Sequence, residues 1–271
     1  MYPTFLTIHG IQITTYGLMV SVAFATLWLC TVNRGQKIGY PIEFLQNLLT
    51  IIVICGIVFA RLLYVIVYWD YFLQNPFETI FSRVGYIFFG GFVGAVVGVA
   101  WYTRKHGKSS FGVADLIAPY VALAHGIGRI GCFLFGCCYG GRCELPWAVR
   151  FPQDSPAFID QLNQGLISTT ATRSLPVHPS QLYESIFNFA LFLALTALRK
   201  RQSFRGQIAM SYLMIYCVGR FLIEFTRGDE RGGLGVFSTS QWICLLLVAG
   251  GSAGYYALRR KAAPPERCLS E

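Results

Sequence analysis

Ionisable side chains interrupt several of the most apolar stretches of this sequence. Arg61 lies in VFARLLYVIVYW, Arg129 in GIGRIGCF, and Arg220 and Glu224 in YCVGRFLIEF. An ionised group at bilayer depth is costly unless it is paired or lines a wet cavity. Because Arg220 and Glu224 are four residues apart, they share one face of a helix and can pair.

These arginines have two interpretations. In the structural one, an ion pair such as Arg220–Glu224 holds helices together. In the functional one, several arginines converge on an anionic ligand, because the apolar stretches hold few acids to balance them. A guanidinium matches phosphate in a bidentate fit, and the phosphate that a membrane supplies is phospholipid. The sequence therefore favours a phospholipid site with Arg129 and Arg220 as its clamps.

A second concentration of reactive residues runs through HGIGRIGCFLFGCCYGGRCELPW, residues 125–147. Its glycines allow close backbone approach and turns, although small residues also serve helix packing. Its cysteines follow the pattern C-x4-C-C-x4-C, which is not the usual spacing of zinc ligands. Free thiols are the plainest state, and a disulfide from Cys137 to Cys143 or a metal site that includes His125 or His178 stays open. We assign no metal ligands and no cofactor. The four cysteines are Cys132, Cys137, Cys138 and Cys143.

The composition indicates a membrane protein. Of 271 residues, 54% are hydrophobic and 13% charged, with a mean hydropathy of +0.50, whereas soluble domains carry about 25% charged residues. The net charge is +9. No basic run is interleaved with exposed aromatic residues, so we expect no nucleic-acid partner.

The apolar stretches predict an all-α integral membrane protein with about seven transmembrane helices. Each stretch approaches the roughly 20 residues that a span requires. No internal repeat or linker divides the chain, so residues 1–271 are predicted to form one membrane domain. The predicted spans are 14–32, 45–68, 86–102, 111–135, 182–198, 208–225 and 241–258.

Lys and Arg placement predicts the orientation. Thirteen cationic residues lie in the loops after the first, third and fifth spans and in the C-terminal tail, against six in the other loops. Cytoplasmic loops carry the cationic excess, so the N-terminus is predicted outside and the C-terminus in the cytoplasm. The polar segment 137–180 then forms a periplasmic loop, with room for one short helix, between spans four and five. The six cations of the other loops are Arg83, Arg142, Arg150, Arg173, Arg227 and Arg231.

Several motifs together resemble one family. GRIGCFLFGCCYG, residues 128–140, is similar to the signature G-R-x-G-N-F-x-N-G-E-x-x-G of the bacterial prolipoprotein diacylglyceryl transferase family. Six further segments match in the family's order and extend the resemblance over nearly the whole chain. They are YGLM, ARLLYVIVYWDYFLQNP, ADLIAP, LPWAVRFP, HPSQLYES and YCVGRFLIEFTRGDE.

Three departures from the family pattern bear on the chemistry. Cys132 and Cys137 stand where the family usually has Asn and Glu. Phe89, in YIFFGG, stands where it usually has a histidine that is often assigned as the base. Phenylalanine cannot accept a proton, so the proton must go elsewhere or the chemistry has changed.

The resemblance implies an activity in the bacterial cytoplasmic (inner) membrane. The sn-1,2-diacylglyceryl group of phosphatidylglycerol is transferred to the lipobox cysteine thiol of a prolipoprotein signal peptide. The products are a thioether and glycerol phosphate, and the partners are membrane lipid and the precursor peptide. Cations near the phosphate stabilise charge on the leaving group, and a positive site favours the thiolate of the incoming cysteine.

The resemblance also implies site residues. Arg129 and Arg220 bind the phosphate, and Glu224 orients Arg220. For the base, the order of preference is His125, then no dedicated base because the arginine field activates the thiol, then His178. His125 is four residues before Arg129 and shares its helical face. The remaining substrate-binding candidates are Tyr16, Tyr216, Gly140 and Arg61.

One alternative from another class stays open. A helical membrane protein with buried arginines could transport or bind an anionic solute or lipid. Such transporters often consist of two related halves with broken helices. The sequence shows no such repeat.

The cation distribution yields a test of topology. Reporter fusions placed after Lys105 and after Arg201 should both give a cytoplasmic signal, because both sites follow odd-numbered spans. Alkaline phosphatase and green fluorescent protein fusions would report the two sides independently. An external signal at either position would contradict the predicted orientation.

Overall fold

The computed structural model describes residues 4–8, 11–82, 85–228, 233–234 and 236–262. Arg83 and Arg231, two of the loop cations named above, lie outside the described residues, as does the C-terminal tail from residue 263.

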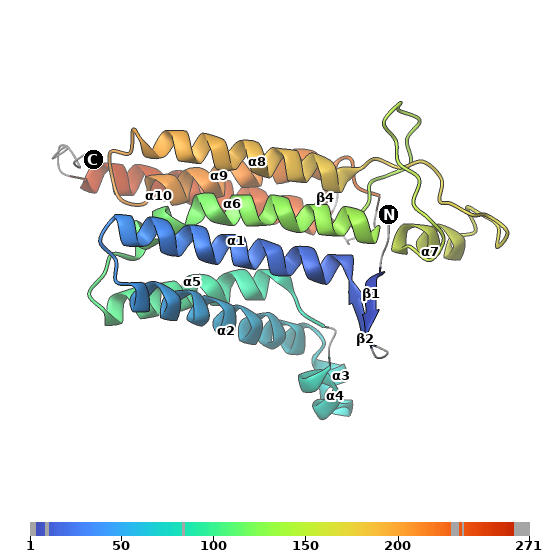
Figure 1. The fold of residues 1–271 in the computed structure, drawn as a ribbon, viewed down its shortest axis with the longest axis horizontal. Helices are drawn as coiled ribbons and strands as arrows, with labels where there is room; N and C mark the ends of the chain where they lie inside the picture. Colours follow the sequence, from blue (N-terminus) through green and yellow to red (C-terminus); the bar gives the residue numbers. More distant parts are fainter. Residues whose placement is uncertain (1–3, 9–10, 83–84, 229–232, 235, 263–271) are drawn as a thin grey trace. The chain divides into compact units, whose positions relative to one another are not determined.

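Helices account for most of the described chain (Figure 1). They follow the predicted spans closely, and the ends differ by a few residues. The helices are α1 (Thr15–Lys37), α2 (Ile42–Val67), α3 (Trp69–Gln74), α4 (Pro76–Phe81), α5 (Phe88–Lys105), α6 (Ser110–Phe135), α7 (Pro156–Asn163), α8 (Ser180–Arg199), α9 (Gln207–Glu224) and α10 (Thr239–Lys261).

Five of these helices are long and apolar enough to cross a membrane: α1, α2, α6, α8 and α10. The prediction of a helical integral membrane protein is therefore supported, but the count of seven spans is supported only in part. The other two predicted spans coincide with α5 and α9, which are helices of 18 residues each. Their charged C-terminal ends, Arg104 and Lys105 in α5 and Glu224 in α9, shorten the apolar length.

Two short antiparallel hairpins depart from the all-α prediction. β1 (Thr4–Ile8) pairs with β2 (Ile11–Thr14), and β3 (Gly233–Leu234) pairs with β4 (Phe237–Ser238). The first hairpin is rich in Ile and Thr, whose branched side chains favour strands. Both hairpins immediately precede a long helix, α1 and α10 respectively.

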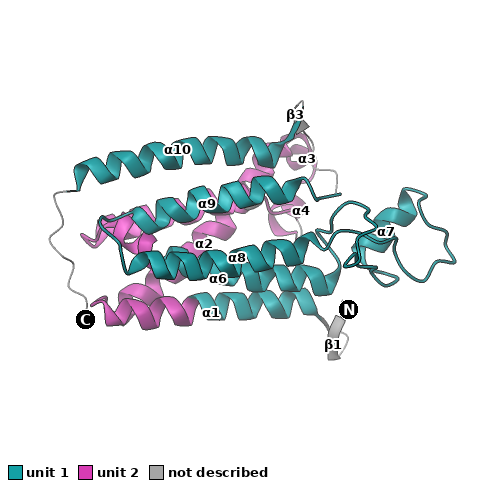
Figure 2. Cartoon of the chain, turned by 90° about the horizontal axis from the view of Figure 1, so that it is seen from above, with its two compact units in different colours: residues 1–27, 117–271 teal, residues 28–116 magenta. Residues whose placement is uncertain are grey.

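The chain divides into two compact units (Figure 2). Unit 1 comprises Met1–Leu27 and Ile117–Glu271, and unit 2 comprises Trp28–Leu116. Helices α1 and α6 each run from one unit into the other. The prediction of a single membrane domain is not tested by this division.

Unit 2 is held together by close packing of α2 on α5, and glycines make it possible. A Cβ atom on Gly94 would lie 2.3 Å from the Cys55 carbonyl oxygen, and one on Gly90 would lie 2.4 Å from the Phe59 carbonyl oxygen. Small residues allow helix backbones to approach in a membrane. Here they let α5 lie directly against the α2 backbone.

Unit 1 packs the second part of α6 with α8, α9 and α10, which run side by side in both views (Figures 1 and 2). Where α6, α8 and α9 meet, the core is aliphatic and fully buried. Gly219 of α9 has no room for a side chain, because its Cβ atom would lie 2.1 Å from the Phe187 ring. The buried core residues are Ala118, Ala122, Leu191, Leu195 and Ile208.

The segment between α6 and α8 forms a small ordered region with its own core. Tyr139, Phe151, Ala157 and Val177 are buried together there. The segment contains α7, whose N-cap Ser155 accepts a hydrogen bond from the backbone of Phe158. The predicted loop with one short helix is thus confirmed in its secondary structure, and its periplasmic location stays a prediction.

Candidate functional site

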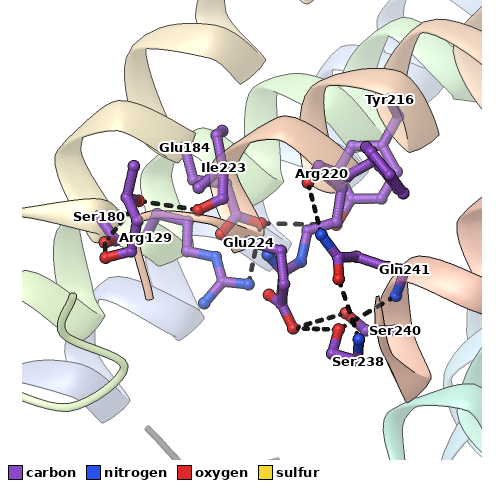
Figure 3. Close-up of polar contacts among 12 residues, drawn as sticks. Arg129, Ser180, Glu184, Tyr216, Arg220, Ile223, Glu224, Ser238, Ser240 and Gln241 are labelled. Atoms are coloured by element: carbon purple, nitrogen blue, oxygen red, sulfur yellow. Dashed lines mark hydrogen bonds and ion pairs between the residues drawn. The ribbon is translucent and has the colours of Figure 1, made fainter. Parts of the chain in front are cut away.

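The carboxylate of Glu184, in the first turns of α8, is the centre of a buried polar site in unit 1. The side chain is 1% exposed. Its Oε1 atom lies 2.9 Å from Arg129 Nη2 and 3.3 Å from His125 Nε2, and it accepts a long hydrogen bond of 3.5 Å from the Tyr216 hydroxyl. Three helices, α6, α8 and α9, therefore meet at one oxygen atom (Figure 3).

His125 takes part in the same cluster and faces two partners. Arg129 Nε lies 3.2 Å from His125 Nε2 and can donate to it when the ring is neutral with its proton on Nδ1. When the ring is protonated, Nε2 instead donates to Glu184. The expectation that His125 and Arg129 share a helical face is confirmed.

A glycine allows α8 to come close enough for these contacts. A Cβ atom on Gly126 of α6 would lie 2.8 Å from the Phe189 ring of α8. The Ser185 hydroxyl donates to the carbonyl oxygen of the same glycine at 2.8 Å. Gly126 lies between His125 and Arg129, so this close approach brings Glu184 within reach of both.

The second ion pair lies within α9. Arg220 Nη2 is 2.5 Å from Glu224 Oε2, and both side chains are 7% exposed. The pairing predicted from the four-residue spacing is confirmed. The other carboxylate oxygen of Glu224 accepts hydrogen bonds from Ser238 at 2.8 Å and Ser240 at 3.0 Å.

Helix α10 supports this carboxylate at its N-terminus. Ser238 is the N-cap and forms a capping box with Gln241. The N-terminal end of a helix carries a partial positive charge that favours an anion. The start of α10 therefore holds Glu224, which in turn holds Arg220.

Tyr216 connects the two pairs. Tyr216, Arg220 and Glu224 recur every four residues and so occupy one face of α9. The Tyr216 ring also lies 5.3 Å from the His125 ring, centroid to centroid. Figure 3 shows Arg129 and Arg220 reaching the region of Glu184 from two different helices.

The site lies at one end of the unit 1 helices. Arg129 is six residues before the end of α6, Glu184 four residues after the start of α8, and Tyr216 eight residues before the end of α9. At 1.5 Å per residue these residues lie about 6–12 Å below the helix ends. These depths are smaller than the roughly 15 Å that separates a face of the hydrocarbon core from its midplane.

The structure corrects the expectation of a cationic surplus. Arg129 is paired with Glu184, and Arg220 with Glu224. Sequence reasoning missed Glu184, although it stands in the quoted motif HPSQLYES at the start of the predicted span 182–198. An acid inside an apolar stretch was the available signal, because such a residue needs a partner.

Each arginine nevertheless retains a donor outside its ion pair. Arg220 Nη1 is buried and has no hydrogen-bond partner among the described residues. Arg129 Nη1 contacts the Cys132 sulfur at 4.0 Å, and a thiol is a weak acceptor. Buried guanidinium donors are usually satisfied, so these two nitrogen atoms are suited to an anionic ligand.

The structure places two further predicted residues near the cluster. Tyr16, near the start of α1, packs on Phe135 of α6 with ring centroids 6.2 Å apart and remains 42% exposed. Gly140 donates its backbone N–H to the carbonyl oxygen of His178 at 2.9 Å. A Cβ atom at residue 140 would lie 2.4 Å from the Ser180 hydroxyl, which is a packing reason for glycine.

The structure gives His178 and Arg61 other contacts. His178 Nδ1 lies 3.4 Å from the Tyr183 hydroxyl, which accepts a hydrogen bond from the Trp147 indole at 2.7 Å. Arg61 belongs to unit 2, donates to the carbonyl oxygens of Ser82 and Gly85, and stacks 4.4 Å from the Tyr86 ring centroid. Their predicted roles in the reaction stay predictions.

The fold and site together define a helical membrane protein of several spans with two arginine–carboxylate pairs buried below one end of its helices. Comparison with known proteins gives the family. Residues 3–257 match the family described as prolipoprotein diacylglyceryl transferase. The chain belongs to this family, which confirms the resemblance and favours a transferase over the transporter alternative.

Individual relatives agree over nearly their whole length. The chain is 35% identical over 246 residues to "Phosphatidylglycerol--prolipoprotein diacylglyceryl transferase 2" of Clostridium perfringens, covering 90% of each chain. It is 34% identical to the correspondingly named protein of Clostridium tetani, over 93% of this chain and 95% of the relative. The Bordetella avium protein of that name is 34% identical over 96% of each.

The pairing of Glu184 gives a stability prediction. The substitution Glu184→Gln removes the charge that balances Arg129 and should destabilise the purified protein by about 3 kcal/mol, since breaking a buried pair costs about 3–5 kcal/mol. For a chain of this size the apparent Tm in detergent should fall by roughly 6–12 °C. The exposed Glu144→Gln is the matched control and should leave the Tm unchanged. An unchanged Tm in Glu184→Gln would mean that the ion pair does not stabilise unit 1.

Proposed function

We propose that this chain transfers the sn-1,2-diacylglyceryl group of phosphatidylglycerol to the lipobox cysteine of a prolipoprotein. The reaction forms a thioether and is the first step of bacterial lipoprotein maturation. The names of the relatives support both substrates. The structural observation that carries the proposal is that Arg129, held by Glu184, and Arg220, held by Glu224, each keep a nitrogen donor for a phosphate oxygen.

The reaction requires stabilisation of a leaving phosphate. The acceptor sulfur attacks an sp3 carbon of the glyceryl group, and the bond from that carbon to the phosphate oxygen breaks. The electron pair goes to the phosphate oxygen of glycerol phosphate. Arg129 and Arg220 bind that phosphate, and their fixed donors stabilise its growing charge.

The carboxylates act as positioning residues. Glu184 holds Arg129 through Nη2, and Glu224 holds Arg220 through Nη2, so each guanidinium presents Nη1 in a fixed direction. Fixed orientation is what makes a donor effective at the moment of reaction. The buried position of the site removes competing water, which strengthens these interactions further.

The remaining predicted residues bind substrate. Tyr16 and Tyr216 hydrogen-bond the lipid headgroup, and Gly140 keeps the backbone beside α8 free of a side chain. Arg61 stays a substrate-binding candidate on the basis of the sequence alone. The exposed ring of Tyr16 supports a ligand contact better than the partly buried ring of Tyr216, which already donates to Glu184.

His125 is the preferred base. It contacts Arg129 and Glu184 directly, whereas His178 contacts Tyr183. When Arg129 donates to Nε2 the ring is neutral, and a neutral ring is the form that a base requires. If neither histidine serves, the two guanidinium groups favour the thiolate of the acceptor without a dedicated base.

The proposal also includes orientation. We place the chain in the bacterial cytoplasmic membrane with seven spans, including α5 and α9, an external N-terminus and a cytoplasmic C-terminus. This orientation puts the C-terminal end of α6 and the segment 137–179 on the outer side. The polar site would then lie toward the face where prolipoproteins emerge. The cation distribution of the loops supports it.

The phosphate role of the arginines is testable by substitution. Arg129→Ala and Arg129→Lys should each lower the transfer rate by roughly 100-fold or more. Alanine removes the charge, and lysine keeps it but cannot bind phosphate through two nitrogen donors at once. Transfer would be measured with labelled phosphatidylglycerol and a lipobox peptide. Arg173→Ala, at an exposed loop position, is the control and should keep the normal rate.

A double variant separates the phosphate role from a structural one. Arg220→Met combined with Glu224→Gln removes both charges of the pair and leaves no uncompensated ion. If the pair were structural alone, this variant would recover transfer relative to Arg220→Met. If Arg220 binds the phosphate, the double variant should stay inactive although its Tm is higher than that of Arg220→Met.

The choice of base is testable by a pH–rate profile. A histidine base accepts a proton only when neutral, so the wild-type rate should fall as acidity protonates it. His125→Gln should lose this acidic limb and roughly 100-fold or more of the rate. His178→Gln should keep both. If both variants retain the wild-type rate and profile, activation by the arginine field replaces the histidine.

A further inference from the structure

Three cysteines gather beside the site, and the proposed transfer gives them no role. The sulfur atoms of Cys132, Cys137 and Cys138 all lie within 4.8 Å of one another. Cys132 is buried at the end of α6, and the other two are half-buried in the turn that follows. The acceptor peptide supplies its own thiol, so these thiols are not required as nucleophiles.

The backbone brings the three sulfur atoms together. Helix α6 ends at Phe135, and Gly136 has a left-handed conformation with φ of +85°. The chain then folds back, so that the Cys137 N–H donates to the Cys132 carbonyl oxygen at 3.2 Å. Cys138 also has a positive φ of +59°, a conformation that costs energy in a residue other than glycine.

Neighbouring side chains hold this turn in place. The buried Gln181 of α8 donates through Nε2 to the Cys137 carbonyl oxygen at 2.7 Å. A Cβ atom on Gly136 would lie 2.9 Å from Ser155 and 3.0 Å from Phe151, so the turn is packed against the core of the segment that follows. The three thiols are therefore preorganised by the protein.

The spacing of the sulfur atoms fits one soft metal ion. Zinc–sulfur bonds of about 2.3 Å place tetrahedral ligands roughly 3.8 Å apart. Sulfur atoms within 4.8 Å of one another reach that spacing when side-chain rotations move them by about 1 Å. Thiolates select soft ions such as Zn²⁺ and Cu⁺ over hard ones such as Mg²⁺ and Ca²⁺.

The charge of the surroundings also fits. Three thiolates and one Zn²⁺ carry a net charge of −1, and Arg129 Nη1 lies 4.0 Å from the Cys132 sulfur. A cation beside a negatively charged metal–thiolate centre stabilises it. Sites with three protein ligands and one open position are those in which bound zinc takes part in chemistry.

We propose that Cys132, Cys137 and Cys138 bind one zinc ion, with the fourth coordination position open to the thiolate of the acceptor peptide. The metal ligands are ones that the sequence spacing did not predict. The role of the open coordination position in binding the acceptor thiolate rests on the proposed transferase function. Zinc coordination deprotonates a bound thiol outright, which would supply in this chain the activation that Phe89 cannot.

The step balances without a further reactant. The acceptor S–H bond breaks on coordination, and its proton passes to His125, the proposed base, and from there to water. The sulfur then forms the bond to the glyceryl carbon, and the bond from that carbon to the phosphate oxygen breaks with its electron pair. The thioether product is a weaker zinc ligand than a thiolate, so it leaves the open position after transfer.

Metal binding is measured on the full-length protein in detergent, after removal of any histidine tag and without donor lipid. Mass spectrometry of the metal should give one Zn²⁺ per chain. Titration with Co²⁺ or Cd²⁺ should produce thiolate-to-metal charge-transfer absorption. Cys132→Ser, Cys137→Ser and Cys138→Ser should each weaken binding by about 10-fold or more. The matched control Cys143→Ser, outside the cluster, should bind as the wild type does.

Several outcomes would overturn the site. The zinc site would be refuted if the wild-type protein bound no more metal than the triple serine variant. Gel filtration and thermal unfolding would establish that both proteins are folded. Binding that Cys143→Ser abolishes equally would refute the assignment of ligands. Because these measurements contain no donor lipid, they stand whether or not the chain transfers diacylglyceryl groups.

The open position is tested with the Co²⁺-loaded protein and two lipobox peptides. The peptide with cysteine should change the visible spectrum, and the same peptide with serine should not. Removal of zinc by a chelator should lower the transfer rate at least 10-fold, and added Zn²⁺ should restore it. Full transfer by metal-free protein would overturn thiolate activation while leaving the transferase function intact.

Discussion

The ion pair between Arg129 and Glu184 constrains the rest of unit 1. It joins α6 to α8 across a bilayer-depth interface, where one unbalanced charge would cost about 3–5 kcal/mol. The pair requires close approach of the helices, which Gly126 permits. It also fixes the direction of the remaining Arg129 donor, and with it the geometry of His125. The helix packing, the charge balance and the proposed chemistry at this end of the helices therefore all depend on the contact between Arg129 and Glu184.

The second arginine is balanced in a different way. Arg220 and Glu224 lie on one helix, so their pairing needs no neighbouring helix, and α10 adds the hydroxyl groups of Ser238 and Ser240 to the carboxylate. The Arg129–Glu184 pair therefore requires the assembly of α6 with α8, whereas both partners of the second pair are already present in α9. Tyr216 lies between them and contacts Glu184 from the α9 side.

Local spacing made part of this site readable from the sequence. The long helices follow from the length of the apolar stretches, and the Arg220–Glu224 pair and the common face of His125 and Arg129 follow from helical periodicity. The partner of Arg129 did not follow, because a contact between two helices has no fixed separation in sequence. The thiol cluster was hidden by the turn at Gly136, which returns Cys137 and Cys138 to Cys132 across the end of the helix. Both hairpins were missed because they are too short to show a clear alternation.

The placement of Glu184 also has a consequence for biosynthesis. Arg129 is translated about 55 residues before its carboxylate partner, which at 5–20 residues per second is a delay of roughly 3–11 s. During that interval α6 enters the membrane with an unneutralised guanidinium, whose long side chain reaches toward the nearby interface. The ribosome delivers Arg220 and Glu224 almost together. Insertion of α6 is thus the step of co-translational assembly at which the nascent chain depends on the arrival of a later helix.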